Sequence, residues 1–231
     1  MEPDNRQTCE PLGEVVETST IAFTAQCHPP RLHAPPEVGT FVRILPPGAS
    51  PAADSDSSIE DPFLEPEEQI GHVAAPPETL YAVVVEAYTT GADPGRKAMA
   101  YGLDEESLRA EQPQIFHLLT TEFRAVHLAV QGHNQKLRGG PPAVPPRLHA
   151  FVYPCTQTEF YALTELPDLP RRLLFLPEIA LPDPLIVACL RKAYAQRGND
   201  FDFLVRMGKQ FAVLLRGDAD RLNALLRDLE P

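Results

Sequence analysis

The chain has 231 residues, enough for one large domain or for one domain with a substantial appendage. Hydrophobic residues make up 43% of the chain, so a core can be buried, while proline is frequent at 26 residues and the net charge is −12. Residues 1–111 hold 20 acids and 6 bases and residues 112–231 hold 12 acids and 14 bases, which argues against autonomous binding of nucleic acid, because such proteins present a strongly basic surface.

Cysteine usage and hydropathy indicate the compartment. The four cysteines lie far apart and form no C-x-x-C pair, a usage typical of a reducing environment. The first residues contain no basic region followed by an apolar run, and no apolar stretch reaches the roughly 18–20 residues of a membrane helix. We therefore expect a cytoplasmic protein without membrane insertion.

The N-terminal part is predicted to form strands separated by proline-rich loops. Residues 1–12 are polar with two prolines, so we expect a flexible N-terminus. A short β-favouring run begins at Gly13. A strand follows over Thr20–Cys27, where apolar and polar residues alternate with the period of two of a half-buried strand. A third strand is predicted over Gly39–Leu45, and the turn signal Pro46–Pro47–Gly48 ends it.

Residues 46–79 separate the third predicted strand from the fourth. They hold eight acids and no base, and unopposed charge with few apolar residues cannot offset the entropy of ordering, so we expect a mobile acidic insertion. The fourth strand, Leu80–Thr89, is apolar almost throughout, which is typical of a strand buried on both faces. A short helix capped by Asp104 is predicted after it.

The segment Gln112–Gln131 carries the strongest pattern in the chain and allows two interpretations. Its apolar residues fit one helix, and its second half also fits a strand, so periodicity alone does not separate them. Pro113 suits the first turn of a helix, whereas Thr120–Thr121 are β-branched and favour a break. We predict a short helix over residues 113–119 followed by a strand over residues 122–130.

The rest of the chain is predicted to be a linker followed by a helix-rich subdomain. Residues 132–146 contain paired glycines and prolines and are assigned to the linker. The subdomain, residues 147–231, opens with a strand candidate over Arg147–Pro154.

Three helices are predicted at the C-terminal end of the chain. The first is capped by Asp183 and ended by Gly198, the second covers about residues 200–215, and the third is capped by Asp218. The third helix carries an apolar stripe that is either core or a docking helix for a partner, formed by Leu222, Leu225, Leu226 and Leu229.

The first half of the chain contains, in order, the segments G-E-V-V-E-T-S-T (13–20), I-A-F-T-A-Q-C (21–27), E-V-G-T-F-V (37–42), L-Y-A-V-V-V-E-A-Y (80–88) and T-T-E-F-R-A-V-H-L (120–128). This series resembles the HAS barrel, the small β-barrel shared by HerA-type ATPases and the N-terminal crown of ATP-synthase α/β subunits. The segment Q-P-Q-I-F before the last strand is similar to stand-alone HAS-barrel proteins of cyanobacterial type, which lack an ATPase domain. Ala82 stands where the family usually has a glycine.

The resemblance implies an α+β fold. A small N-terminal antiparallel β-barrel would occupy residues 13–131, with residues 46–79 as an insertion, and a mixed, helix-rich C-terminal subdomain would follow. In the family such barrels cap or anchor a ring-shaped ATPase motor and do no chemistry themselves. The implied partner is therefore a protein, conceivably a HerA-like ATPase that is encoded separately.

Sequence motifs for catalysis are missing. The chain has no G-x-x-x-x-G-K-[ST], no G-x-G-x-x-G and no G-x-S-x-G. Cys27, His28 and His33 could suggest a metal site, but adjacent ligands rarely reach one ion together, so we interpret them as a strand-end thiol and loop histidines. His117 and His127 lie in patterned segments and are interpreted as core or edge residues. We predict no enzymatic activity, no metal and no cofactor.

Four residues are predicted to contact a partner. Glu122 and Arg124 lie two apart on one face of a predicted strand, where they form either a structural ion pair or a contact surface. Arg171 and Arg172 form one of the densest basic pairs, together with Arg191–Lys192.

The favoured function is a non-catalytic protein-interaction or assembly module. A small-ligand binder or enzyme with a pocket between barrel and C-terminal subdomain is the first alternative. The second is a nucleic-acid accessory protein that uses the two basic pairs.

Overall fold

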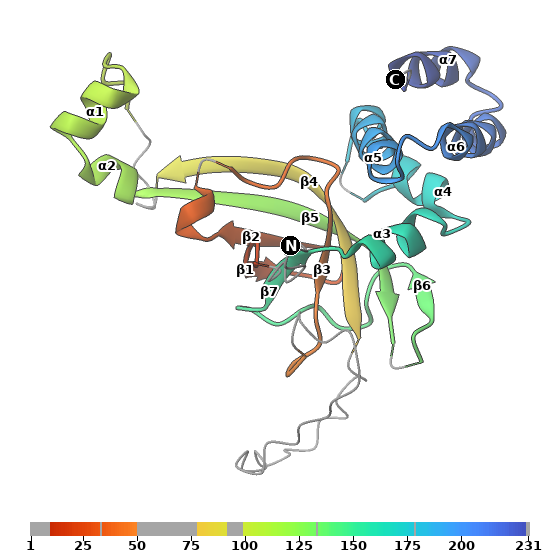
Figure 1. Cartoon of the computed structure of the whole chain (residues 1–231), viewed down its shortest axis with the longest axis horizontal. Helices are drawn as coiled ribbons and strands as arrows, with labels where there is room; N and C mark the ends of the chain where they lie inside the picture. The colour runs from red at the N-terminus through yellow and green to blue at the C-terminus, as the bar shows by residue number, and fades with distance from the viewer. Residues whose placement is uncertain are drawn as a thin grey trace, which may run out of the picture.

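The computed structural model describes residues 10–32, 34–49, 78–91, 99–132, 134–177 and 179–229. In these residues the fold is α+β, with a closed antiparallel β-barrel near the N-terminus and seven α-helices, mostly in the C-terminal part (Figure 1). This is the predicted fold class. Most of the predicted flexible N-terminus and of the predicted acidic insertion, positions 1–9 and 50–77, lies outside the described residues.

Six strands close the barrel. They are β1 (Gly13–Thr18), β2 (Ala22–Cys27), β3 (Phe41–Ile44), β4 (Thr79–Gly91), β5 (Leu119–Gln131) and β7 (Phe151–Pro154). Their order is β2–β1–β7–β3–β4–β5, all neighbours are antiparallel, and β5 returns to pair with β2. A short strand, β6 (Leu137–Gly139), pairs with β5 beyond the end of β2.

The barrel includes a strand from beyond the predicted linker. β7 pairs with β1 through Val152 opposite Gly13, and with β3 through Tyr153 opposite Arg43. The predicted boundary after residue 131 assigns this strand to the C-terminal subdomain. A strand of four residues carries too little pattern to show where it pairs, because its partners are more than 100 positions away along the chain.

Two hydrophobic cores share the strands of the barrel. Successive side chains of a strand point to opposite faces, and in β4 the side chains of Leu80, Ala82 and Val84 fill the barrel interior. Tyr81 and Val83 between them point outward and pack with the helices. The interior core also holds Val15, Phe23, Ala25, Val42, Ile44, Phe123, Ala125, Val130 and Val152. The helix-covered face explains why β4 is apolar almost throughout, as the sequence predicts.

The segment Gln112–Gln131 folds as a short helix followed by a strand, as predicted. The helix is α2 (Gln114–His117) and the strand is β5. The helix before it, α1 (Glu105–Glu111), is capped by Asp104, whose carboxylate accepts a hydrogen bond from the Ser107 backbone N–H at 2.8 Å. This cap is also as predicted.

β4 and β5 pair over their whole length, from Thr79 opposite Gln131 to Gly91 opposite Leu119. On its other edge β5 pairs with β2 only between Glu122 and Val126. The far end of the β4–β5 pair therefore projects as a two-stranded ribbon that carries α1 and α2, at the opposite end of the molecule from the C-terminal helices (Figure 1). Every residue of α1 and α2 is at least partly exposed.

Five helices form a C-terminal lobe against the outer face of the barrel (Figure 1). They are α3 (Gln157–Thr164), α4 (Leu169–Leu174), α5 (Asp183–Gln196), α6 (Phe201–Leu214) and α7 (Ala219–Asp228). The core that they share with the barrel includes Val126, Leu128, Phe160, Leu163, Leu173, Ile186, Leu190, Phe203 and Phe211.

The helix boundaries agree with the predicted caps at one of two positions. Asp218 caps α7 by accepting a hydrogen bond from the Arg221 backbone N–H at 3.1 Å. The prediction that Asp183 caps α5 is wrong: Pro182 occupies the N-cap position and Asp183 is the first helical residue. The Asp183 carboxylate instead pairs with the Arg221 guanidinium at 2.6 Å and so joins the start of α5 to α7.

A buried polar cluster joins the lobe to the barrel. Arg43 of β3 donates to Glu159 of α3 at 2.8 Å, and their side chains are only 8% and 16% exposed. The Tyr81 hydroxyl lies 3.2 Å from the same carboxylate and 2.8 Å from the Gln131 side-chain oxygen. Burial, and then the charge of Glu159, raises the pKa of Tyr81 far above its ordinary value.

Glu159→Ala should destabilise the protein by about 3 kcal/mol, because it breaks a buried ion pair and leaves polar partners in a low-dielectric setting. Urea unfolding followed by circular dichroism measures the change. Glu105→Ala is the matched control, since the Glu105–Arg109 pair is exposed and should contribute less than about 0.5 kcal/mol. Equal effects of the two substitutions would contradict the structural role of the cluster.

His127 makes the stability of the barrel depend on pH. Its side chain is buried on β5 beside Phe23, with ring centroids 5.5 Å apart, and neither ring nitrogen has a hydrogen-bond partner of normal geometry among the described residues. Burial lowers the pKa of His127 to about 4; the nearby backbone of Ser19 acts weakly in the opposite direction.

Because an unfolded histidine titrates near pH 6.5, the unfolded chain binds an extra proton between about pH 6.5 and pH 4. Stability should therefore fall as the pH falls through this window, by about 2 kcal/mol between pH 7.5 and pH 5. Urea unfolding of wild type and His127→Leu at both pH values isolates this contribution. The variant should lose about 2 kcal/mol less than wild type; an identical loss would show that His127 is not the titrating group.

Candidate interaction surface

Helix α6 has apolar residues on two faces. On the inner face Phe203, Met207 and Phe211 are buried in the core of the lobe. Asp200 is the N-cap of α6, because its carboxylate accepts a hydrogen bond from the Phe203 backbone N–H at 3.0 Å. A helix needs one apolar face to pack on its own domain, so a second apolar face requires another explanation.

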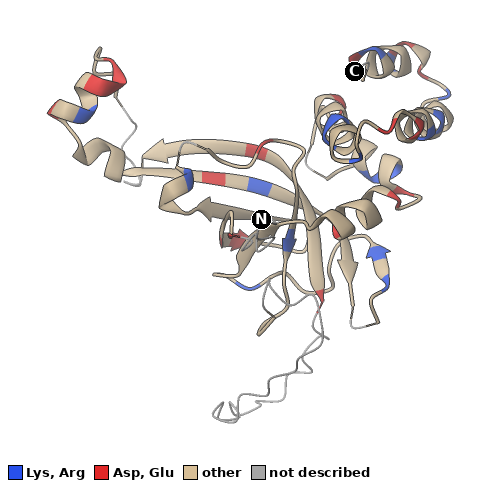
Figure 2. Cartoon of the chain, in the orientation of Figure 1, with Lys and Arg blue, Asp and Glu red and all other residues tan. Residues whose placement is uncertain are grey.

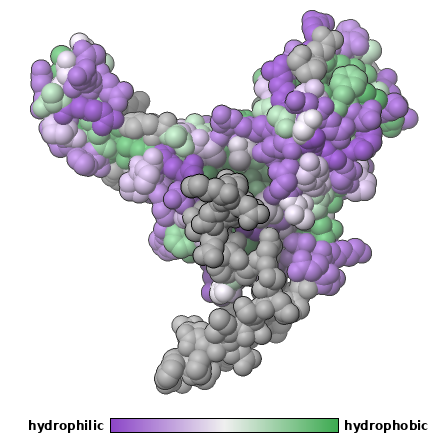
Figure 3. All heavy atoms as spheres, in the orientation of Figure 1, coloured by the Kyte–Doolittle hydropathy of each residue, from purple (hydrophilic) through white to green (hydrophobic). Residues whose placement is uncertain are grey.

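The second face of α6 forms a groove with α7. Phe201 is 60% exposed, Val205 is 37% exposed, and Leu226 of α7 is 38% exposed. A hollow of about 360 Å³ lies between the two helices. We call this the α6–α7 groove; its lining residues are Phe201, Leu204, Val205, Gly208, Lys209, Ala212, Leu226 and Leu229. Figure 3 shows a hydrophobic area on the lobe of the C-terminal helices.

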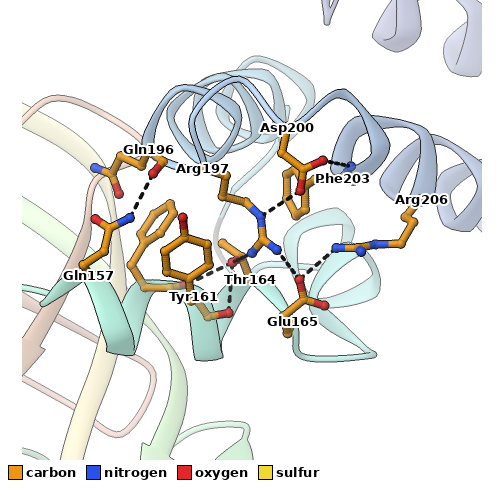
Figure 4. Close-up of polar contacts among 10 residues, drawn as sticks. Gln157, Tyr161, Thr164, Glu165, Gln196, Arg197, Asp200, Phe203 and Arg206 are labelled. Carbon is orange, nitrogen blue, oxygen red and sulfur yellow. Dashed lines mark hydrogen bonds and ion pairs between the residues drawn. The ribbon is translucent and has the colours of Figure 1, made fainter.

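Arg197, just after α5, holds the start of α6 against α3 (Figure 4). Its side chain is 9% exposed and donates to the Thr164 hydroxyl at 2.8 Å and to the Glu165 carboxylate. The guanidinium carbon lies 4.8 Å from the ring centroids of both Tyr161 and Phe203. Charge, hydrogen bonds and two aromatic faces therefore fix one side chain at the junction of three helices.

Two further contacts extend this network onto α6. Arg206 donates to Glu165 at 2.8 Å, and the Arg197 Nε lies 3.5 Å from the carboxylate of Asp200, the α6 N-cap (Figure 4). The backbone N–H of Phe203 and the nearby arginines lower the pKa of Asp200, in that order of strength. The α6 side of the groove is thus tied to α3 and α5.

Glu122 and Arg124 lie on the outer face of β5, beside the ribbon that carries α1 and α2. Glu122 accepts a hydrogen bond from the Tyr88 hydroxyl at 2.8 Å. Arg124 lies opposite Glu86 in the β4–β5 register. Burial, with the hydrogen bond to Glu122, raises the pKa of Tyr88 to about 12.

Arg171 and Arg172 point to different surfaces although they are adjacent. Arg171 is exposed and lines a hollow of about 450 Å³ between α4 and α6. Arg172 pairs with Asp168, and a Cβ added at Gly139 would lie 2.5 Å from its Nε, so its guanidinium occupies the space over β6. The four predicted contact residues therefore do not form one surface, and their contact with a partner stays a prediction.

The residues considered for a metal site do not assemble one where the structure describes them. His28 packs against Phe151, with ring centroids 5.8 Å apart, and His33 lies outside the described residues. Within the described ranges no three His, Cys, Asp or Glu side chains are grouped as metal ligands would be. Burial raises the pKa of the Cys27 thiol to about 11 and that of Cys189 to about 12, so neither thiol is activated as a nucleophile.

The charges of the lobe are mixed. Figure 2 shows acidic and basic positions interspersed along α3–α7, which differs from the single-sign stripe that binds nucleic acid. Lys192, one of the basic residues named for that function, pairs with Glu37. Of the helices in the described ranges, none combines the length and apolar character needed to cross a bilayer.

The outer face of α6 is the feature that sequence reasoning missed. Of the α7 leucines predicted to be either core or a docking helix, Leu225 and Leu229 are buried and Leu226 is 38% exposed. The missed signal is a second apolar stripe in the 200–215 helix. Its residues Phe201, Val205, Gly208 and Ala212 are spaced by four, three and four positions.

Arg197→Lys should weaken the lobe by about 2 kcal/mol, because an ammonium cannot make the forked contacts to Thr164 and Glu165 or lie flat on two rings. Urea unfolding gives the size of the effect, and hydrogen exchange at the start of α6 shows where it acts. The control is Arg216→Lys, an exposed arginine just after α6. If both variants match wild type in exchange at α6, the network does not position the helix.

A scan against protein-family models finds no family that matches this chain. A search of the curated proteins likewise finds no relative. The function is therefore argued from the structure itself, a closed antiparallel β-barrel with a helical lobe, and from the α6–α7 groove.

Proposed function

We propose that this chain is a non-catalytic protein-interaction module, in which the barrel carries a helical lobe and the α6–α7 groove receives a partner. One observation carries the proposal. Exposed Phe201, Val205 and Leu226 converge on one hollow that is mostly apolar in its lining. Single exposed apolar residues are common, but contiguous apolar patches usually mark interaction sites.

The network around Arg197 supports this function. Interaction sites that bind with useful affinity are preorganised, because ordering a surface upon binding costs free energy. Arg197 and the α6 N-cap Asp200 fix the start of α6, and Asp183 pairs with Arg221 at the start of α7. Both walls of the groove are therefore held before a partner arrives.

We also propose that the barrel is of the HAS type. The support is the closed antiparallel barrel of six strands together with the ordered segments that resemble that family. These 231 residues contain no phosphate-binding loop. On this proposal the partner of the barrel is the motor that such barrels accompany, a HerA-like ATPase.

A small-ligand site is the second candidate function. A hollow of about 420 Å³ lies where the outer face of the barrel meets the segment before α5, and it is lined by Val85, Glu86, Arg124 and Ile179. Glu86 and Arg124 occupy opposed positions in the strand register, so opposite charges are adjacent there and the hollow offers no group of like charges that would select a charged ligand. The protein-interaction function is therefore favoured.

Val205→Glu should abolish partner capture while the fold is kept, since Val205 is exposed and a carboxylate in the groove opposes apolar contact. The tagged full chain is used to capture proteins from native cells, and bound proteins are quantified by mass spectrometry. Partners that depend on the groove should fall by at least about tenfold, which corresponds to about 1.4 kcal/mol.

Leu181→Glu is the matched control, because Leu181 is an 80% exposed leucine outside the groove. Circular dichroism confirms that both variants are folded. Recovery of the same proteins by wild type, Val205→Glu and Leu181→Glu would refute the groove as the interaction site.

A further inference from the structure

The outer face of α6 has a size pattern that matches itself when reversed. Phe201 and Val205 are large, and Gly208 and Ala212, at the other end of the same stripe, are small. When a second α6 is laid antiparallel, the spacing of four, three and four places Phe201 opposite Ala212 and Val205 opposite Gly208, and both contacts occur twice. We infer that the α6–α7 groove binds a second copy of this chain through an antiparallel pair of α6 helices; this rests on the proposed function and names its partner.

Gly208 makes the close approach of the two helices possible. A Cβ at this position would lie 3.2 Å from Leu226 Cδ2, so α7 already packs closely over it. Gly208 and Leu226 both line the hollow of the groove. In the dimer Val205 of the second copy lies against Gly208 and Leu226, and Phe201 of the second copy lies over Ala212. A large side chain of one α6 thus meets a small residue of the other at each contact.

Charged residues beside the stripe fit the same arrangement. Asp202 and Lys209 are both exposed, and each follows a stripe residue by one position. In an antiparallel helix pair, such flanking positions of one helix face the equivalent positions of the other. Asp202 of one copy therefore faces Lys209 of the second, and the two-fold symmetry repeats the pair.

Within the described part of the chain, neither Asp202 nor Lys209 forms an ion pair. The ion pairs of the lobe are formed by other residues, namely Arg172, Lys192, Arg197, Arg206 and Arg221 with carboxylates other than Asp202. The antiparallel arrangement brings these opposite charges together twice, and a second copy of the chain supplies both of them. The charge pattern therefore favours a second copy in the antiparallel arrangement.

The interface is small, so the dimer should be weak and reversible. One 14-residue helix with contributions from α7 lies at the low end of specific interfaces. We therefore expect a monomer–dimer equilibrium in the micromolar range, which sedimentation velocity of the full chain resolves between about 1 µM and about 200 µM.

Charge reversal tests the arrangement directly. Asp202→Lys and Lys209→Asp each place like charges opposite one another twice per dimer, so each should weaken dimerisation by at least about tenfold. The double variant Asp202→Lys with Lys209→Asp restores both attractions and should return the dissociation constant to within about threefold of wild type. Arg191→Asp is the control, an exposed charge of α5 outside the groove, and should leave dimerisation unchanged.

The helix stability of each variant is followed by circular dichroism. Asp202 lies in the first turn of α6, so its loss weakens the helix equally in Asp202→Lys and in the double variant. Rescue by the double variant can therefore come only from the interface.

Two results would overturn the inference: a wild-type chain that stays monomeric across the range, or a double variant that stays as weak as the single ones. Neither result would remove the proposed function, because the Val205→Glu capture experiment tests whether any protein binds the groove and does not require that protein to be a second copy.

Discussion

The Glu159 carboxylate connects the two parts of this molecule. One oxygen accepts hydrogen bonds from the backbone N–H and hydroxyl of Thr156 and so completes the capping box that starts α3. The other oxygen receives Arg43 of β3 and lies near the Tyr81 hydroxyl of β4. The same side chain therefore starts the first helix of the lobe and attaches that helix to the barrel. If α3 began one residue later, the carboxylate would turn away from Arg43, so helix register and docking are fixed together.

The lobe in turn determines which residues of the barrel are apolar. A closed barrel buries one face of each strand, and the other face normally meets water. Here the helices cover the outer face of β4 and of the second half of β5, where Tyr81, Val126 and Leu128 pack with Leu163 and Ile186. Beyond this cover, the same outer face of β5 carries Glu122 and Arg124. The change from apolar to charged residues along one strand marks the edge of the lobe.

Much of the local structure could be predicted from the sequence, because it depends on neighbours along the chain. The strand within Thr20–Cys27, the caps Asp104 and Asp218, and the helix–strand junction within Gln112–Gln131 are all present in the structure. Each follows from periodicity or from a hydrogen bond to a residue three positions away. The half-buried alternation predicted for Thr20–Cys27 is not present, because Thr24 is buried and Ile21 is 40% exposed.

The parts that could not be predicted depend on contacts between distant segments. The place of β7 is fixed by its pairing with β1 and β3. Asp183 does not cap α5 and instead pairs with Arg221, which is 38 positions away. The candidate site was only partly visible for the same reason. An apolar residue such as Val205 looks like core in a sequence, and only the packed lobe shows that the core is already filled by Phe203, Met207 and Phe211.

The long β4–β5 ribbon has a mechanical consequence. The two strands are paired from the α1–α2 end to the part of β5 that lies under the lobe (Figure 1), with register shifts between Tyr81 and Ala82 and between Val84 and Glu86. The same two strands carry α1 and α2 at one end and, through Val126 and Leu128, belong to the core shared with the helices of the lobe at the other. A displacement of α1 and α2 would therefore reach the lobe through backbone pairing rather than through a flexible loop.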